Sequence, residues 1–404
     1  KSDGGWAEGW VAARGAKRQL KDTKRTDELE RIETLIETLK PESLSDRIGA
    51  YILPKGWSSL DVADLDFDDD DKRKKAEERA NKIAEEIGRE LASDHTLLAE
   101  HLPDLAVGEN YRLVTLFQAI GDHVEDIFGA WEIVRSVSLS TLGQGQYIPA
   151  SSVIRGISAR DEDAARTILD GALANQETHP IFVSLQVNAG MNEDGVARLL
   201  KAADMESVSI YTFGHLSWCN EWIENHQNEF AELVGKIARR EGGERVAFEI
   251  MRGLGWTKRR EEKALSPAER EIGKQLLLNA RFARGDHDHL RGHRFQELAE
   301  TCLEEGVDGD VATAICERIV EGTNNYTIFA HDFVGLVGVL SEKFPIEVLN
   351  GLVARASENF EIPELFDWRR LAKLKPASKM NPDVLLAWVA EEPEARSLAA
   401  AHGP

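Results

Sequence analysis

The sequence of 404 residues predicts an all-α protein, organised as an α-solenoid of loosely repeated antiparallel helix pairs. Three observations lead to this fold class. Apolar residues recur at helical spacing through most of the chain, and segments with the alternating pattern of a strand are few. Helix pairs also recur along the sequence, which is typical of helical-repeat proteins.

The clearest helix pair lies between Asn325 and Glu358. The apolar face of its first helix comprises Phe329, Phe333, Leu336, Val337 and Leu340, and that of its second comprises Val348, Leu349, Leu352, Val353 and Ala356. Pro345 stands between the two faces and suits the first turn of a helix, because its missing N–H would be unpaired there anyway. Neither helix can bury its apolar face alone, so we expect an antiparallel pair.

A weaker internal repeat begins after Pro149. The dipeptides Ala165-Arg166 and Ala197-Arg198 lie 32 residues apart, and each follows an acidic helix start. A third helix, over residues 228–239, lies at a similar further offset. A period of this length with paired helices indicates an α-solenoid.

We expect three regions along the chain: an irregular N-terminal segment over residues 1–25, an N-terminal helical region over residues 26–142, and a helical-repeat region over residues 143–404 that is truncated at its C-terminus. The first region is polar and rich in glycine, with Trp6 and Trp10 as its only anchors. Gly143, Gly145 and Pro149 mark the boundary between the second and third regions.

Capping residues and apolar spacing predict individual helices. Thr26 begins a helix that Pro41 ends, and a long helix is expected over residues 72–101. Ser266 is a strong start signal, because Pro267 and Glu269 then occupy N1 and N3. Other helices are expected at about 109–121, 123–138, 267–283, 289–304, 309–321, 327–342, 345–357, 382–389 and 393–401. We interpret residues 208–213 as the start of a helix or, at most, an edge hairpin.

Composition narrows the classes of function. The formal net charge of −22 repels nucleic-acid phosphates and anionic lipid headgroups, so we expect neither nucleic acid nor a membrane as partner, although a local basic site stays open. The cysteines, Cys219, Cys302 and Cys316, are too few and too scattered for a disulfide framework or a zinc site, which fits a reducing, cytoplasmic compartment. The chain lacks an initiator Met and a signal-peptide pattern, so we expect a piece of a longer protein.

One dense group of metal-ligand types lies at residues 286–293. His289 and His293 would share a helix face, as a zinc-binding pair requires, with His287 close by. A metal-dependent enzyme using these three histidines is therefore one alternative. Leu290 occupies the place where a metallopeptidase has its catalytic Glu, and neighbouring arginines oppose a divalent cation, so we favour a polar loop and helix start.

The same stretch is a basic island in an acidic chain. Its members are Arg281, Arg284, His287, His289, Arg291, His293 and Arg294. Such an island could bind an anionic ligand or a nucleic-acid end, or its charges could pair internally with Glu297, Glu300, Glu304 and Glu305. Residues 258–260, Lys-Arg-Arg, form a weaker basic cluster, which Glu261 and Glu262 are expected to neutralise.

A secondary binding candidate is the connection at Asn324, Asn325 and Tyr326, because loops along one edge of a solenoid often bind ligands. Trp218, Trp222 and Trp256 could form a recognition surface, but tryptophans at helical spacing favour a core. The chain carries no recognisable phosphate loop or nucleophile elbow, and no cofactor is expected.

The helix pairs around residues 161–173, 193–201 and 329–356, and the closing segment 384–401, resemble the C-terminal helical-repeat regions of large bacterial multidomain proteins. These include antiphage defence ATPases of the STAND type, whose TPR-like repeats sense a viral protein. The resemblance implies a non-enzymatic sensor or scaffold whose partner is another protein or another domain of the same polypeptide. It assigns no functional residue, and oligomerisation stays open.

Overall fold

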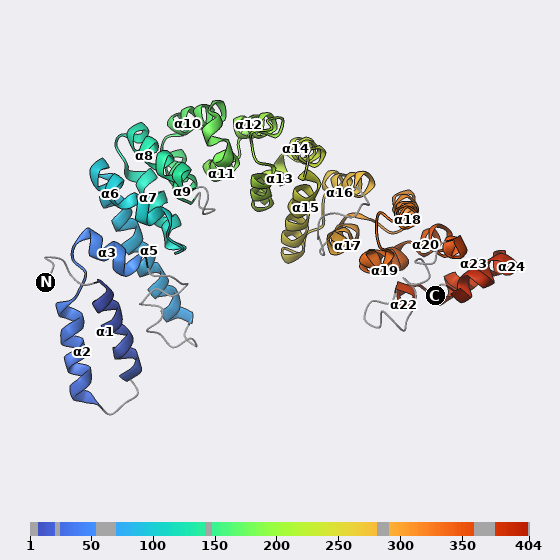
Figure 1. The fold of residues 1–404 in the computed structure, drawn as a ribbon, viewed down its shortest axis with the longest axis horizontal. Helices are drawn as coiled ribbons and strands as arrows, with labels where there is room; N and C mark the ends of the chain where they lie inside the picture. Colours follow the sequence, from blue (N-terminus) through green and yellow to red (C-terminus); the bar gives the residue numbers. More distant parts are fainter. Residues whose placement is uncertain are drawn as a thin grey trace. The chain divides into compact units, whose positions relative to one another are not determined.

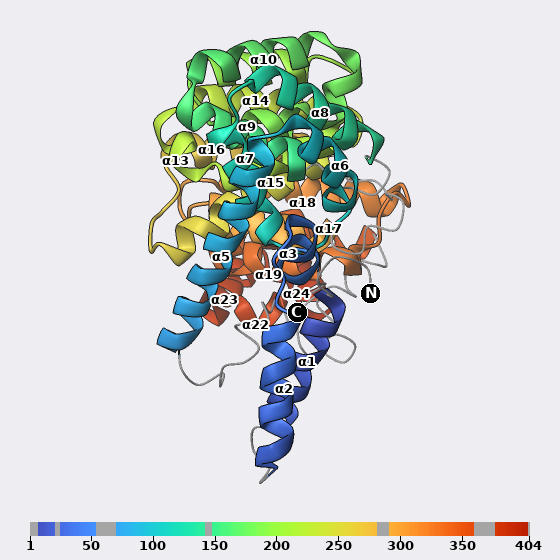
Figure 2. The ribbon, with the colours of Figure 1, turned by 90° about the vertical axis from the view of Figure 1, so that its left-hand side faces the viewer.

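In the computed structural model, all regular structure in the described residues is helical (Figures 1 and 2). The structure describes residues 7–20, 25–53, 70–141, 148–280, 291–358 and 376–402. The predicted all-α class is therefore confirmed. The chain divides into two compact units, Lys1–Ala202 and Ala203–Pro404, and each is described by itself. Within the described ranges, every helix is too short or too polar to cross a lipid bilayer.

The first unit consists of helices that pack against near neighbours in sequence. Their bounds are α1 Ala7–Leu20, α2 Thr26–Thr38, α3 Leu44–Tyr51, α5 Asp70–Ala92, α6 His95–Ala106, α7 Arg112–His123, α8 Ile127–Ser140, α9 Ile148–Arg160, α10 Glu162–Ala174, the 3-10 turn η2 Gln176–Thr178, α11 His179–Ala189 and α12 Glu193–Ala203. In one row, α5 contacts α7, α7 contacts α9 and α9 contacts α11. Leu116, Phe117 and Ile120 of α7 are completely buried in this row.

The N-terminal segment, expected to be irregular, contains the helix α1. Trp10 and Ala13 lie three residues apart on α1 and are both buried. The ring of Trp10 lies 5.3 Å from that of Tyr51 in α3, and α1 also contacts α2. Tertiary burial of one face thus stabilises a helix that its glycine content disfavours. Trp6 lies outside the described residues.

The long helix expected over residues 72–101 is wrong, because the structure has two helices there. α5 ends at Ala92 and α6 begins at His95. Asp94 adopts an extended backbone between them, and its Oδ1 accepts a hydrogen bond from the backbone N–H of Thr96 at 2.7 Å. A side-chain cap therefore interrupts a pattern that apolar periodicity alone extends.

The second unit contains more helices of similar length. Their bounds are η3 Ile210–Trp218, α13 Asn220–Asn225, α14 Gln227–Arg239, α15 Gly243–Arg260, α16 Pro267–Asn279, α17 Arg291–Cys302, α18 Gly309–Asn324, η4 Ala330–Phe333, α19 Val334–Lys343, α20 Pro345–Gly351, η5 Val353–Glu358, α22 Pro376–Lys379, α23 Pro382–Glu391 and α24 Pro393–His402. Residues 208–213, expected to be helical or at most a hairpin, lead into the 3-10 helix η3.

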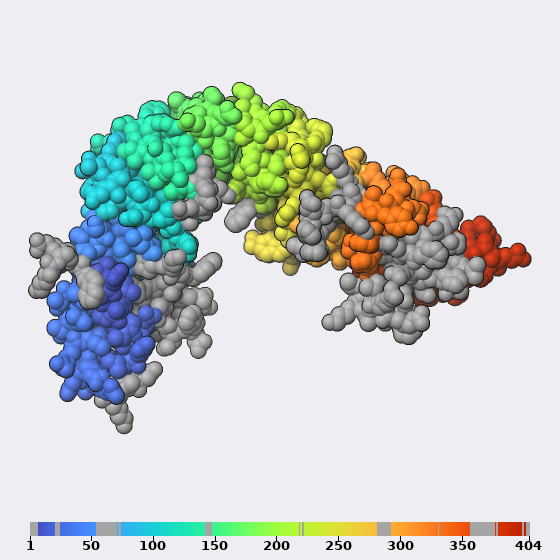
Figure 3. Space-filling model, in the orientation of Figure 1, coloured from blue at the N-terminus to red at the C-terminus, as the bar shows by residue number. Residues whose placement is uncertain are grey.

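Helices of the second unit lie in two rows. One row runs η3, α15, α17, α19, α22, and the other runs α14, α16, α18, α20, α23, with each helix contacting the next in its own row. Contacts of α15 with α14 and α16, and of α19 with α20, join the rows, and side chains fill the spaces between neighbouring helices (Figure 3). Phe295 of α17 lies 4.9 Å from Phe248 of α15 and 5.6 Å from Phe333 of η4, ring centre to ring centre.

Local start signals in this unit are confirmed. Ser266 and Glu269 form a complete capping box, and Pro345 occupies the first turn of α20. The helix expected over residues 327–342 is shorter, because α19 begins only at Val334 and a 3-10 turn precedes it. Phe329, assigned to the apolar face, has an extended backbone and is 39% exposed.

The expected boundary between residues 142 and 143 separates α8 from α9. In the structure α9 packs against both α7 and α8, so dense packing runs across that position. The two compact units divide after Ala202, within the last turn of α12, and the predicted regions stay a prediction. Pro149 lies in the first turn of α9, and Gly143 and Gly145 lie outside the described residues.

Candidate functional site

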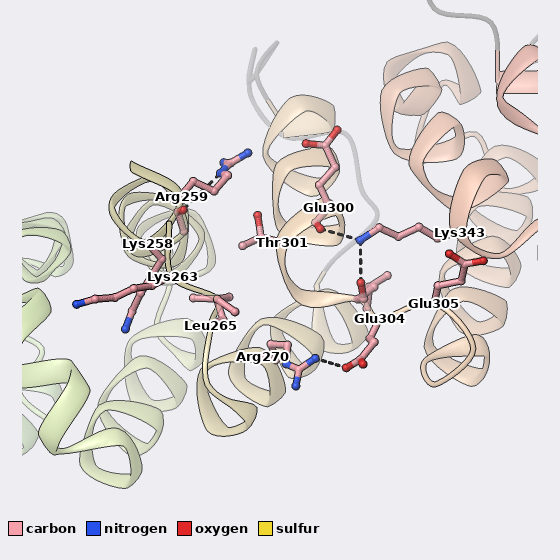
Figure 4. Close-up of a pocket in the computed structure, with 13 residues that line it drawn as sticks. Lys258, Arg259, Lys263, Leu265, Arg270, Glu300, Thr301, Glu304, Glu305 and Lys343 are labelled. Atoms are coloured by element: carbon pink, nitrogen blue, oxygen red, sulfur yellow. Dashed lines mark hydrogen bonds and ion pairs between the residues drawn. The ribbon is translucent and has the colours of Figure 1, made fainter. Parts of the chain in front are cut away.

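A cavity of about 500 Å³ in the second unit lies beside the C-terminal end of α15 (Figure 4). Its lining comes from α15, the α15–α16 connection, α16, the end of α17 and α19: Gly255, Lys258, Arg259, Lys263, Ala264, Leu265, Arg270, Glu300, Thr301, Leu303, Glu304, Glu305 and Lys343. Five of these side chains are cationic and three are carboxylates. The local balance of charge is therefore positive, whereas the whole chain carries −22.

Lys258 is the most deeply buried cation of the cavity wall. Its Nζ lies 2.8 Å from Oε1 of Glu224 and 3.6 Å from Oε1 of Glu269, and only 8% of its side chain is exposed. Glu269 is completely buried, and its Oε2 accepts the backbone N–H of Ser266 at 2.7 Å. The capping box that begins α16 therefore also supplies a counter-charge to Lys258, which a buried ammonium requires.

Lys263 lies at the exposed rim. Its Nζ is 3.0 Å from Oε2 of Glu261 and 3.3 Å from Oε1 of Glu224. Hydrogen bonds from Lys258 and Lys263 lower the pKa of Glu224, and the hydrogen bond to Glu261 raises the pKa of Lys263. Half of the Lys263 side chain is exposed, so water screens these pairs and each is weak.

Lys343 closes the cavity from the end of α19. Its Nζ donates hydrogen bonds to the backbone oxygens of Glu300 (2.7 Å) and Leu303 (2.8 Å), at the C-terminal end of α17. Burial lowers the pKa of the Lys343 ammonium. A cation at this end of a helix stabilises carbonyl groups that lack helical partners. Lys343 thus holds α17 and α19 together.

Arg270 and Arg259 differ in their partners. Arg270 forms an ion pair with Glu304. Arg259 is exposed, and its Nε donates to the backbone oxygen of Gly255 at 3.4 Å. Among the described residues, no carboxylate pairs with Arg259. Arg259 and Lys343 are thus the two cavity cations without a carboxylate partner among the described residues, and of these Arg259 is the exposed one, whereas Lys343 is half-buried and bonded to two backbone oxygens.

Trp256 lies on α15 next to this site. It is 58% exposed, and the guanidinium of Arg260 lies over its ring at 5.0 Å from the centre. The expectation that Trp256 belongs to the core is wrong, whereas Trp222 is buried as expected. Trp256 follows Gly255 of the cavity lining directly in sequence, so the surface of α15 beside the cavity carries an exposed aromatic ring.

The basic island predicted around residues 281–294 is described only in part. Arg281, Arg284, His287 and His289 lie outside the described residues, as does the side chain of Arg291 at the start of α17. In the described ranges, no group of three histidine, cysteine or acidic side chains could hold a metal ion. The proposed roles of these residues in metal or anion binding therefore stay predictions.

The two remaining members of the island are paired within the chain. Arg294 is buried, and its Nε lies 2.5 Å from Oε1 of Glu249 in α15. His293 is exposed, and its Nε2 lies 3.6 Å from Oε1 of Glu297. Burial opposes ionisation of Glu249, but hydrogen bonds from Arg252 and Arg294 outweigh it and lower the pKa of Glu249. Internal pairing was expected, yet Glu249 was not among the expected partners.

The connection at residues 324–326 does not line the cavity. Asn324 ends α18, Asn325 follows it, and Tyr326 has a φ of +55° with 76% of its surface exposed. A positive φ is unusual for tyrosine. It turns the chain so that the backbone N–H groups of Thr327 and Ile328 reach the oxygen of Gly322. The predicted binding role of this exposed turn stays a prediction.

Sequence reasoning identified one component of the cavity, the basic cluster at residues 258–260, and assigned it little weight. The contributions of Arg270 and Lys343 were missed, because they are single charges far apart in sequence. A lysine in the last turn of a helix, as at Lys343, was the available signal. Comparisons with protein-family models, curated proteins and solved structures found no match to this chain.

Proposed function

We propose that this chain is a non-enzymatic α-solenoid that recognises another protein, or another domain of its own polypeptide. The observation that carries the proposal is the pair of helix rows in the second unit, in which each helix contacts the next in its row. Such stacking exposes an extended surface built from equivalent faces of successive helices. Extended helical surfaces of this kind serve recognition of macromolecular partners.

The exposed aromatic residues of the second unit support this function. Tyr211, Trp256 and Tyr326 are 68%, 58% and 76% exposed. Tyrosine and tryptophan, together with arginine, are enriched among residues that dominate the binding energy of protein interfaces. Exposed single apolar residues are common, so the support comes from the chemical type of these three and, at Trp256, from the guanidinium of Arg260 over the ring.

We further propose that the module is part of a larger bacterial protein and serves as a sensor in antiviral defence. The support is the resemblance of the helix pairs at residues 161–173, 193–201 and 329–356 to the repeats of STAND-type ATPases. In that role, the solenoid would bind a protein of the invading virus and convey the binding to the rest of the polypeptide.

The test is affinity capture followed by reconstitution. The purified chain is immobilised and exposed to bacterial lysates prepared before and after phage infection, with an unrelated acidic helical protein as control bait. Each captured candidate is then purified, and its binding is measured by calorimetry. We expect a stoichiometric complex with one protein that the control bait does not bind.

The recognition function would be contradicted by the following outcome. If no purified candidate binds, while a metal ion or a small metabolite raises the melting temperature strongly, the recognition function is wrong. An enzyme or a small-ligand receptor would then explain the chain better. Elemental analysis of the purified protein distinguishes these outcomes, because a metal-dependent enzyme would carry stoichiometric metal.

A further inference from the structure

We propose that Trp256, Arg259 and the adjoining cavity form the docking site for an acidic segment of the partner, with Arg259 binding a carboxylate and Trp256 an apolar side chain beside it. This inference rests on the proposed recognition function and names where and how it operates. It commits to a peptide segment with aspartate or glutamate next to an apolar residue.

The pairing of the cationic side chains in the cavity wall singles out Arg259. Lys258 is held by Glu224 and Glu269, Arg270 by Glu304, and Lys343 by two backbone oxygens. Arg259 has no carboxylate partner among the described residues and points its guanidinium away from Lys263 (Figure 4). A guanidinium presents paired N–H donors that match both oxygens of a carboxylate, so it favours this ligand over a neutral one.

The position of Trp256 accounts for the apolar side chain that we expect beside the carboxylate of the ligand. Trp256 precedes Arg259 by three residues, so both lie on the same side of α15. The guanidinium of Arg260 lies over the exposed ring at 5.0 Å from its centre, so an apolar side chain of the partner would pack on the part of the ring that Arg260 leaves open. Leu265 and Leu303 add apolar surface to the cavity. The site therefore combines one carboxylate receptor with adjoining apolar area, as interface hot spots do.

The acidic residues of the cavity argue against nucleic acid as the occupant. Glu300, Glu304 and Glu305 line the wall formed by the end of α17, opposite Arg259 (Figure 4). A continuous phosphate backbone would meet these carboxylates as well as the arginine, and the net charge of −22 would add to the repulsion. A single carboxylate on a peptide reaches Arg259 alone, so an acidic peptide is the better match.

Short random peptides displayed on phage provide the probe. The library is selected against the full chain, and enriched peptides are synthesised with a fluorophore for anisotropy titrations at low and raised salt. We expect enriched peptides to carry aspartate or glutamate beside an apolar residue. Their binding should weaken with salt, because a rim-exposed charge pair is screened.

Substitutions then locate the site. Arg259→Glu should weaken binding roughly tenfold or more, and Trp256→Ala should weaken it roughly tenfold, as hot-spot residues do. Arg259→Lys should give an intermediate loss, since it keeps the charge without the paired donors. The matched control is Arg245→Glu, which makes the same charge change on α15 about 21 Å away along the helix. Both arginines are exposed, and circular dichroism confirms folding of every variant.

Several results would overturn the docking site. Enriched peptides without acidic residues would do so, as would equal effects of Arg259→Glu and Arg245→Glu. A single-stranded oligonucleotide that binds more tightly than the peptides and depends on Arg259 would assign the site to nucleic acid instead. A captured protein partner that binds the Arg259→Glu variant and the wild type equally would refute this site while leaving the recognition function intact. Failure of every protein to bind refutes the recognition function itself.

Discussion

Gly121 of α7 and Gly156 of α9 bring two helix backbones into direct contact. A Cβ atom added at Gly121 would lie 3.1 Å from the Cα of Gly156 and would overlap the backbone oxygen of Val153. A Cβ added at Gly156 would lie 2.7 Å from the backbone nitrogen of Asp122 and would overlap the oxygen of Gln118. Only glycine permits this approach, which joins α7 and α9 in the row of the first unit.

The first prediction concerns this crossing. Gly156→Ala should destabilise the chain by roughly 3 kcal/mol, because the added methyl group forces two packed backbones apart. Gly171→Ala is the matched control, since Gly171 lies within α10 and a Cβ there meets no atom within 4 Å. That change should stabilise by about 0.5–1 kcal/mol through helix propensity. Urea unfolding measures both, and equal effects would show that the crossing is not tight.

The buried pair Lys258 and Glu269 yields a second prediction. Lys258→Met should destabilise by roughly 3 kcal/mol, because it leaves the carboxylate of Glu269 buried beside a neutral side chain. Glu269→Gln combined with Lys258→Met should recover much of the loss, since glutamine keeps the capping box without the charge. A double-mutant cycle in urea quantifies the coupling. Additive effects would indicate that the two charges do not interact.

A third prediction is a dependence of stability on pH through Glu249. Its pKa in the folded chain is lowered from the ordinary value of 4.5, so the unfolded chain binds a proton more readily. The stabilisation is therefore complete above pH 4.5 and is lost as the pH falls through the folded value. As the pH is lowered through that window, the urea midpoint of the Glu249→Gln variant should fall less steeply than that of the wild type. If the urea midpoints of both proteins fall in parallel with pH, the Arg294–Glu249 pair is not the cause of the pH dependence.

Thiol reactivity provides a fourth prediction. Burial raises the pKa of Cys219 to about 11 and those of Cys302 and Cys316 to about 12. Since the thiolate is the reactive form, all three should resist a disulfide reagent at neutral pH in the native chain. All three should react at once in guanidinium chloride. Rapid native labelling of any one of them, located by mass spectrometry, would show that its surroundings open easily.

The fifth prediction tests the solenoid arrangement. Trp388 of α23 is buried, and its Nε1 donates to Oδ1 of Asn350 at 2.7 Å. In an array with contacts only between neighbours, Trp388→Ala should raise amide exchange in α20, α23 and α24. Protection in α15 and α17 should stay unchanged, because α20 and α19 lie between α23 and α17 in the succession of helix contacts, and α15 lies one helix further. Uniform loss of protection throughout the second unit would contradict the solenoid.

Local sequence signals predicted most helices because the determinants of a helix lie within a few residues. The capping box at Ser266, the proline at position 345 and the closing helices α23 and α24 follow from residues that touch within one turn. Where local signals conflicted, two different contacts decided. Burial of Trp10 stabilises a helix in a glycine-rich segment. The side-chain cap of the exposed Asp94 ends a pattern that the apolar spacing would continue.

The candidate site could not be predicted in the same way. Its cations come from three helices and one connection, and the partner of Arg294 lies 45 residues away at Glu249. Periodicity shows which face of a helix is apolar but not which other helix covers it. The exposure of Trp256 beside the cavity likewise depends on which helices pack against α15.

The sequence by itself determined that this protein is all-α and where most of its helices begin and end, because these properties follow from residues within a few positions of one another. It also determined the strongly negative charge, which is a sum over composition alone. Only the tertiary structure decided that Gly121 meets Gly156, that Glu269 faces Lys258, and that Arg259 lacks a carboxylate partner among the described residues. Those relationships depend on how helices far apart in the chain pack together, and that packing sets which charges are matched and which surface stays open for a partner.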